Sequence, residues 1–240
     1  MVKLRRLKKS VLACYLAVSL AFMTALGLCI SVLYSPQAVG ASDGGLKIVI
    51  DAGHGGIDGG VTGVQTGVKE SDLNLTLAFV LKDELEKIGF EVALTRKSEG
   101  GLYDTTEKGF KKRDMQKRKE IIEKESPAMV LSIHQNYYSS RAVRGAQVFY
   151  GQKNPRSKTL ANVLQANLNA VYNSKGVKDR KSAYGEYFML ECYTAPSVII
   201  ESGFLSNSAD EKLLLDESFQ KTLAKSIADG VLLFFTEQSA

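Results

Sequence analysis

Residues 47–60, KIVIDAGHGGIDGG, constrain the fold of this chain more than any other stretch. They begin with an apolar β-branched run, Ile48 to Ile50, and such a run before a turn is typical of a buried strand. His54 follows among five glycines, which let the backbone turn sharply and leave open space around the imidazole. Parallel strands open at their carboxyl ends into a ligand crevice. We therefore expect an α/β fold with His54 at the edge of the sheet.

The rest of the chain alternates between strand-like and helical patterns. Apolar residues at helical spacing predict a helix over 71–88, and the strand expected at 90–95 completes a β-loop-α-β unit. Further strands are expected at 128–133, 146–150, 187–190 and 197–200, a polar loop at 176–184, and helices at 111–125, 158–172 and from 209 onward. The pattern predicts a single α/β domain with a mostly parallel twisted sheet flanked by helices.

The first 41 residues are typical of an export segment. Five positive charges precede residue 10, and the 24 residues 11–34 carry no charge. A small-residue site at 39–41 completes a secretory signal peptide, but the apolar run is also long enough to remain as an N-terminal membrane anchor. In both cases the positive flank stays inside, so the protein is exported across the cytoplasmic membrane and is either secreted or membrane-anchored. Residues 42–46 form a linker, and we expect one domain over 47–238.

The charge of the exported part gives no reason to expect nucleic-acid binding. Of the 31 Lys and Arg residues, 26 follow residue 42, and they are balanced by the 26 Asp and Glu residues of the chain. A neutral domain lacks the basic footprint that nucleic acid requires. The predicted helix over 111–125 is heavily charged in both signs, and we expect it to be a solvated surface helix.

Three strand-like runs end in an ionisable residue, and these residues are the candidates for a functional site. His54 and His134, which are the two histidines of the chain, follow two of the runs, and Glu201 follows the third. If the three strands are parallel neighbours, these side chains converge at the C-terminal ends of the strands. Two imidazoles and a carboxylate, with a fourth position open to water, are the ligands of a catalytic zinc site.

Such a hydrolase needs a third ligand and a separate carboxylate that moves a proton from the attacking water to the leaving nitrogen. The residues alone leave the third ligand open among Asp58, Glu70 and Asp72, although the loop after His54 can fold back to Glu70. Glu201 suits the proton transfer, because a strand holds it rigidly and burial raises its proton affinity. The alternative is that Glu201 forms an ordinary ion pair.

Four ordered motifs, IDAGHGG, KES, SIHQN and IIESGFLSN, resemble those of the zinc-dependent N-acetylmuramoyl-L-alanine amidases. The resemblance covers about residues 47–235 and implies one domain with one zinc ion (Zn²⁺). It implies His54, Glu70 and His134 as the zinc ligands and Glu201 as the general base. The reaction that it implies is hydrolysis of the amide between N-acetylmuramic acid and L-alanine in peptidoglycan.

A narrower resemblance is to the germination-specific spore-cortex amidases. It rests on the insertion TRKSEGGL…EKGFKKRDMQKR and on the tail VLLFFTEQ. It implies that the protein acts at the developing spore cortex and removes stem peptides as a step to muramic δ-lactam. A muramic acid deacetylase would act next, and an activating lipoprotein partner is implied by the clostridial members of the group.

Some motif positions bear on substrate contacts. Asn136 is close to His134 in sequence, and we expect it to help orient the substrate. Ala52 stands where proline is more usual, which should change only the stiffness of the loop. Tyr137 and Tyr138 stand where a small residue is commoner, and they are expected to narrow the groove or stack on sugar.

Other functions are compatible with parts of this pattern. A general cell-wall lytic or cell-separation amidase would use the same chemistry, but the sequence has no wall-binding repeat. A zinc carboxypeptidase or deacetylase would use similar ligands, whereas a zinc-stabilised binding module would normally have four. Cys192, the one cysteine outside the apolar run, would need a histidine partner to act as a nucleophile, so we expect it in the core.

Overall fold

The computed structural model describes residues 45–237, which belong to one compact unit. The predicted export segment, most of the linker and the predicted C-terminal boundary at residue 238 lie outside these residues and stay predictions. Within residues 45–237, no helix has both the length and the apolar character that crossing a membrane requires.

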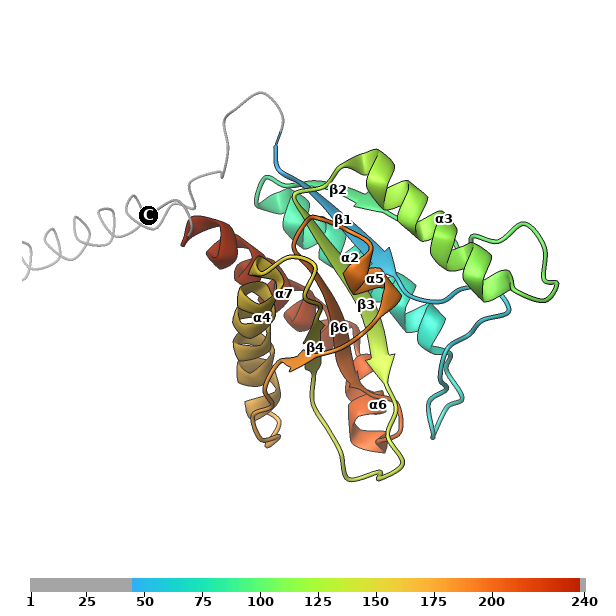
Figure 1. The fold of residues 1–240 in the computed structure, drawn as a ribbon. Helices are drawn as coiled ribbons and strands as arrows, with labels where there is room; N and C mark the ends of the chain where they lie inside the picture. Colours follow the sequence, from blue (N-terminus) through green and yellow to red (C-terminus); the bar gives the residue numbers. More distant parts are fainter. Residues whose placement is uncertain (1–44, 238–240) are drawn as a thin grey trace, which may run out of the picture. The chain divides into compact units, whose positions relative to one another are not determined.

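Six strands form a single sheet (Figure 1). They are β1 (Lys47–Ala52), β2 (Glu91–Leu94), β3 (Met129–Asn136), β4 (Gln147–Tyr150), β5 (Ala183–Tyr184) and β6 (Ser197–Phe204). Their order across the sheet is β2-β1-β3-β6-β4-β5. The first four in this order are parallel, and β4 is antiparallel to β6. The predicted parallel arrangement is confirmed, and the three strands expected to carry the site are neighbours.

Helices cover both faces of this sheet (Figure 1). One face carries α2 (Glu70–Lys87), α4 (Arg156–Asn173) and α7 (Glu217–Thr236), the other carries α3 (Phe110–Glu125) and α5 (Phe188–Glu191), and α6 (Ser208–Leu214) follows β6. Successive residues of a strand point to opposite faces. Ile48 and Ile50 therefore enter the larger core under α2 and α7, while Val49 packs with Ile122 of α3. Burial on both faces explains why residues Ile48–Ile50 of β1 are all apolar.

Strands β3 and β6 are longer than the sequence predicted. They continue to Asn136 and Phe204, so His134 and Glu201 lie inside the strands and form a register pair. The predicted ends at 133 and 200 were wrong because polar side chains do not interrupt a strand whose backbone still pairs. Pairing becomes irregular only between His134 and Asn136, next to the site.

Two further predictions, both for residues 183–190, were wrong. Of residues 187–190, predicted as a strand, 188–190 belong to the one-turn helix α5 and Tyr187 precedes it, because a short apolar run fits either structure. Met189 and Leu190 become buried there as the chain returns toward β6. Residues 183–184, predicted as part of a loop, form the edge strand β5 beside β4.

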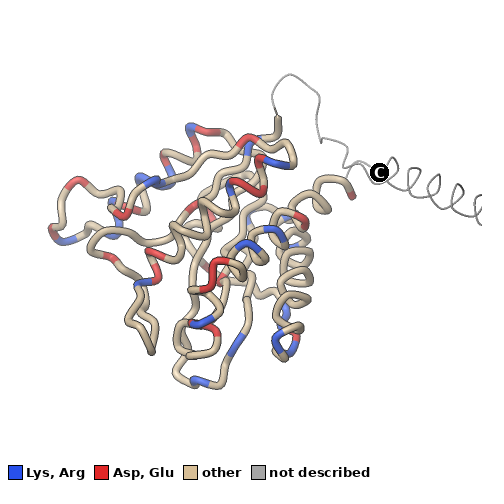
Figure 2. Tube along the Cα trace, turned by 180° about the vertical axis from the view of Figure 1, so that it is seen from behind, with Lys and Arg blue, Asp and Glu red and all other residues tan. Residues whose placement is uncertain are grey.

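Helix α3 is only partly the solvated helix that its charges predicted. Asp114 and Arg118 are buried and lie on the same face as Ile122. The remaining charged residues of the helix are exposed or half-buried. Over the described chain, Lys and Arg residues are interspersed with Asp and Glu residues (Figure 2).

Candidate metal centre

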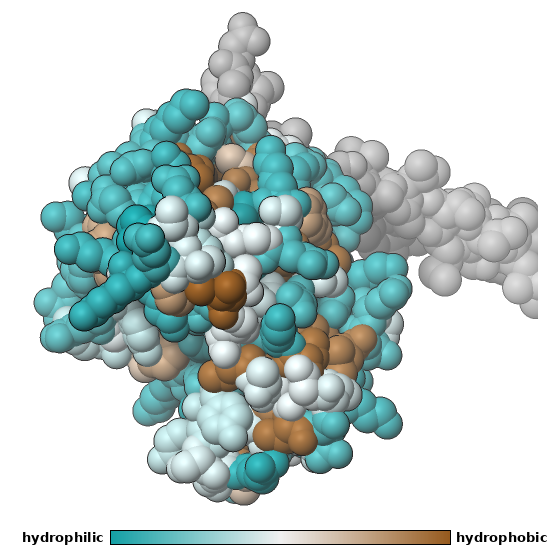
Figure 3. Space-filling model, turned by 90° about the vertical axis from the view of Figure 1, so that its right-hand side faces the viewer, coloured by the Kyte–Doolittle hydropathy of each residue, from teal (hydrophilic) through white to brown (hydrophobic). Residues whose placement is uncertain are grey.

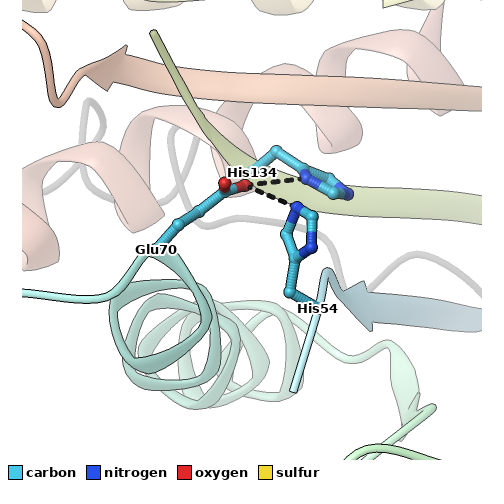
Figure 4. A group of neighbouring side chains, drawn as sticks. All are labelled: His54, Glu70 and His134. Atoms are coloured by element: carbon cyan, nitrogen blue, oxygen red, sulfur yellow. Dashed lines mark hydrogen bonds and ion pairs between the residues drawn. The ribbon is translucent and has the colours of Figure 1, made fainter. Parts of the chain in front are cut away.

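Three side chains from separate elements meet at the carboxyl end of the sheet (Figure 4). His54 follows β1, Glu70 is the first residue of α2, and His134 lies in β3. Glu70 Oε1 lies 2.9 Å from His134 Nδ1 and 3.3 Å from His54 Nε2. One donor atom from each residue lies within 4.8 Å of the other two. Of the three carboxylates considered from the sequence, the structure brings Glu70 between the histidines, whereas Asp72 is exposed.

Backbone donors fix the carboxylate of Glu70. The N–H of Val61 donates to Oε2 at 2.9 Å, and the N–H of Gln135 donates to Oε1 at 3.2 Å. Burial alone would raise the pKa of Glu70, but hydrogen bonds from His134 and His54 hold it well below its usual range. Glu70 is therefore ionised, which is the form that binds a metal.

Asp58 orients the ring of His54 from the side away from Glu70. Its Oδ2 lies 3.0 Å from His54 Nδ1, which leaves Nε2 facing Glu70. Burial lowers the pKa of His54, but the bonds to Glu70 and Asp58 outweigh it and raise the pKa to about 9. At this pKa both ring nitrogens of His54 carry a proton, and the proton on Nε2 faces Glu70. A cation bound at Nε2 would replace that proton. Asp58 Oδ1 also pairs with Lys111 at 3.0 Å.

The residues of this group fit the predicted zinc ion. A Cβ atom at Gly53 would overlap the His134 imidazole, and one at Gly60 would overlap the Glu70 carboxylate. Only glycine allows the backbone so close to the donors at these two positions. Two imidazole nitrogens and one carboxylate oxygen, with a cavity beside the histidines, match an open catalytic zinc site.

Glu201 lies next to this group on the neighbouring strand. It is the register partner of His134, and its Oε2 is buried without a hydrogen-bond partner among the described residues. Burial raises the pKa of Glu201 to about 7. A buried, unpartnered carboxylate of this kind is suited to accept a proton and release it near neutral pH.

Two buried arginines, Arg96 and Arg118, hold the loop that carries His54, and we call them the arginine clamp. Arg118 donates to the carbonyls of Ala52 at 2.7 Å and His54 at 2.5 Å. Arg96 donates to the carbonyls of Ala52 at 2.9 Å and Gly53 at 3.0 Å. Each carbonyl from 52 to 54 therefore has a guanidinium donor. The clamp supports His54 at φ 60°, a left-handed conformation that non-glycine residues rarely adopt.

Two carboxylates in turn hold Arg118. Its guanidinium donates to Asp51 Oδ1 at 2.7 Å and to Asp114 Oδ2 at 2.6 Å. Burial would raise the pKa of Asp51, but the charge of Arg118 and hydrogen bonds hold it below its usual value. The clamp was not predicted from the sequence. The spacing of Met115, Arg118 and Ile122 along α3 could have indicated that Arg118 faces inward.

Two other residues singled out from the sequence do not line the cavity beside the histidines. Asn136 does not line the cavity beside the histidines, and its Oδ1 accepts a hydrogen bond from the N–H of Tyr137 at 2.8 Å. Its role toward substrate stays a prediction. Cys192 is half-buried and packs against the smaller core cluster under α3. Burial raises the pKa of its thiol, which is typical of an unreactive cysteine.

The chain is similar in sequence and in structure to proteins that are named as amidases. The family model for N-acetylmuramoyl-L-alanine amidase matches residues 48–232. A germination-specific N-acetylmuramoyl-L-alanine amidase of Bacillus subtilis is 34% identical over 197 residues, covering 81% of both chains. A probable cell wall amidase, LytH, of Staphylococcus aureus is 31% identical over 80% of this chain and 59% of its own length. The solved CwlD amidase from Clostridioides difficile, in complex with the GerS lipoprotein, has a TM-score of 0.74 and 33% identity, covering 80% of this chain and 99% of that one.

Removing the charge of Arg118 should destabilise the fold strongly. Arg118→Met leaves the buried Asp51 without its ion-pair partner, and we expect a loss of about 3–5 kcal/mol in the free energy of unfolding. Urea denaturation measures this loss. Lys117→Met, on the exposed side of the same helix, is the control and should change stability by less than about 0.5 kcal/mol. Similar small effects of both substitutions would contradict the proposed importance of the clamp.

Proposed function

The chain belongs to the N-acetylmuramoyl-L-alanine amidase family of hydrolases, and on this basis we propose that it cleaves the muramoyl–alanine amide of peptidoglycan with one Zn²⁺. His54, Glu70 and His134 would hold the ion, and Glu201 would be the general base. The observation that carries this proposal is the unpartnered oxygen of Glu201 beside three converging donor atoms. The zinc dependence and these residue roles are our proposals for this chain.

Each residue of the site has a separate role in the proposed reaction. When bound, zinc polarises the scissile carbonyl and makes a water nucleophilic at neutral pH. Glu201 Oε2 accepts a proton from the attacking water and then donates it to the leaving nitrogen of L-alanine. Asp58 keeps the His54 ring oriented, and backbone N–H groups keep Glu70 in position. The arginine clamp holds the loop that carries His54, so the site is organised before substrate binds.

We also propose a role in spore cortex and germination. It is supported by the similarity to the germination-specific amidase of Bacillus subtilis and to the clostridial CwlD structure. The protein would act outside the cytoplasmic membrane, carried there by the segment before residue 42. A deacetylase would use its product on the way to muramic δ-lactam. Since the CwlD chain was solved with a lipoprotein, we propose a lipoprotein as an activating partner here.

Glu201→Gln should separate metal binding from chemistry. We expect this variant to retain about one zinc per chain and to lose hydrolysis of muramoyl peptides by at least about 100-fold, because general base catalysis is removed. His54→Ala should lose both zinc and activity. Metal content by plasma mass spectrometry and product release by chromatography measure the two properties. Loss of zinc from Glu201→Gln would show that the role of Glu201 is misassigned.

The cortex role predicts a change in spore peptidoglycan. Spores of a strain that lacks this gene should contain little or no muramic δ-lactam, because the stem peptides stay attached. Muropeptide analysis by mass spectrometry measures the lactam, and the strain complemented with the wild-type gene is the control. Unchanged δ-lactam would contradict the cortex role and favour a general cell-wall lytic amidase with the same chemistry.

A further inference from the structure

The metal centre opens onto a cavity of about 250 Å³ whose far walls have no role in the proposed chemistry. His54 and His134 line its inner end. One wall comes from α3 and the other from the segment at α5, with Phe110, Lys111 and Met115 facing Tyr187, Phe188 and Met189. A substrate whose amide lies at the two histidines has room for one of its two halves in this cavity.

Apolar side chains make up much of the cavity wall. Phe188 and Tyr187 remain 47% and 42% exposed, although both are large and carry aromatic rings. On the side of the molecule seen in Figure 3, apolar patches lie among hydrophilic and intermediate residues. Exposed apolar side chains beside a cavity commonly mark a ligand site. A sugar would need hydrogen-bond partners for its hydroxyl groups, and of the six residues named for the two walls only Lys111 and Tyr187 carry a polar group.

Lys111 is the cationic residue of this wall whose N–H donors are not all used. Arg118, which also lines the cavity, donates to Asp51, Asp114 and two backbone carbonyls. Lys111 Nζ pairs with Asp58 at 3.0 Å, and its side chain is 66% exposed. An ammonium group has three N–H donors, so Lys111 can bind a second carboxylate at the mouth of the cavity.

We propose that this cavity binds the peptide half of the substrate and that Lys111 pairs with a carboxylate of that peptide. The proposal rests on the amidase function proposed above. The cavity is smaller than the pockets of about 300–1,000 Å³ that hold drug-sized ligands, so it suits one or two amino-acid residues. The methyl group of L-alanine contacts the apolar wall, and an acidic group one residue further along reaches Lys111. The ligand class is an acidic peptide, and the glycan extends away from the cavity.

Two muramoyl tripeptides test this assignment, one with a free carboxylate and one with a carboxamide on the second stem residue. The zinc-loaded full chain should cleave the carboxylate compound with a kcat/KM about tenfold higher, chiefly through KM, because a charge-assisted hydrogen bond is lost in the amide. Lys111→Gln should abolish this preference, and Lys111→Arg should keep most of it. Lys112→Gln is the matched control, since Lys112 is exposed on the same helix and outside the cavity.

The contacts of Lys111 with Asp58 require a second readout. Zinc content should stay unchanged in Lys111→Gln, and an equal loss of activity toward both compounds would overturn the subsite, because Lys111 would then act only through His54. Calorimetric binding of both compounds to Glu201→Gln does not depend on turnover. Equal affinities there overturn the subsite. If the two affinities differ but the wild-type chain hydrolyses neither compound, the subsite is supported and the proposed amidase function is contradicted.

Discussion

Hydrogen bonds from Arg96 and Arg118 to three successive carbonyls are the interaction on which the proposed metal centre depends. They hold the glycine-rich loop after β1, including His54 at φ 60°. Burying two guanidinium groups is costly unless every donor has a partner, and here carbonyls and the carboxylates of Asp51 and Asp114 supply these partners. The cost of desolvation is thus offset by contacts that also position His54, a proposed metal ligand. Stability and function therefore share one network.

The parallel sheet was predictable from the sequence because its central strands β1, β3 and β6 are buried on both faces and contain apolar runs. The ends of β3 and β6 were not, because His134 and Glu201 look like strand terminators although the backbone pairing continues through them. The segment at α5 was ambiguous for another reason. Its few apolar residues fit a strand as well as one helical turn, and only the packing of Met189 and Leu190 decides between them.

The grouping of His54, His134 and Glu201 was predictable because each of them follows a strand-like run, and the resemblance to the family added Glu70 as the third proposed ligand. The residues that position them were not predictable in the same way. Arg118 lies in a run of charges that is typical of a solvated helix, and its burial depends on Asp51, 67 positions away. Asp58 was considered as a ligand, but the structure places it behind His54, where it orients the ring. Long-range contacts of this kind have no local signature.

The sharpest test of the centre is anomalous X-ray scattering at the zinc absorption edge from crystals of the purified protein. We predict one zinc peak at about 2.0–2.2 Å from His54 Nε2, His134 Nδ1 and a Glu70 carboxylate oxygen, with Glu201 outside bonding distance and a fourth position open to water. A zinc peak at another site, or Glu201 as a fourth protein ligand, would contradict the proposed arrangement of an open catalytic centre with a separate general base.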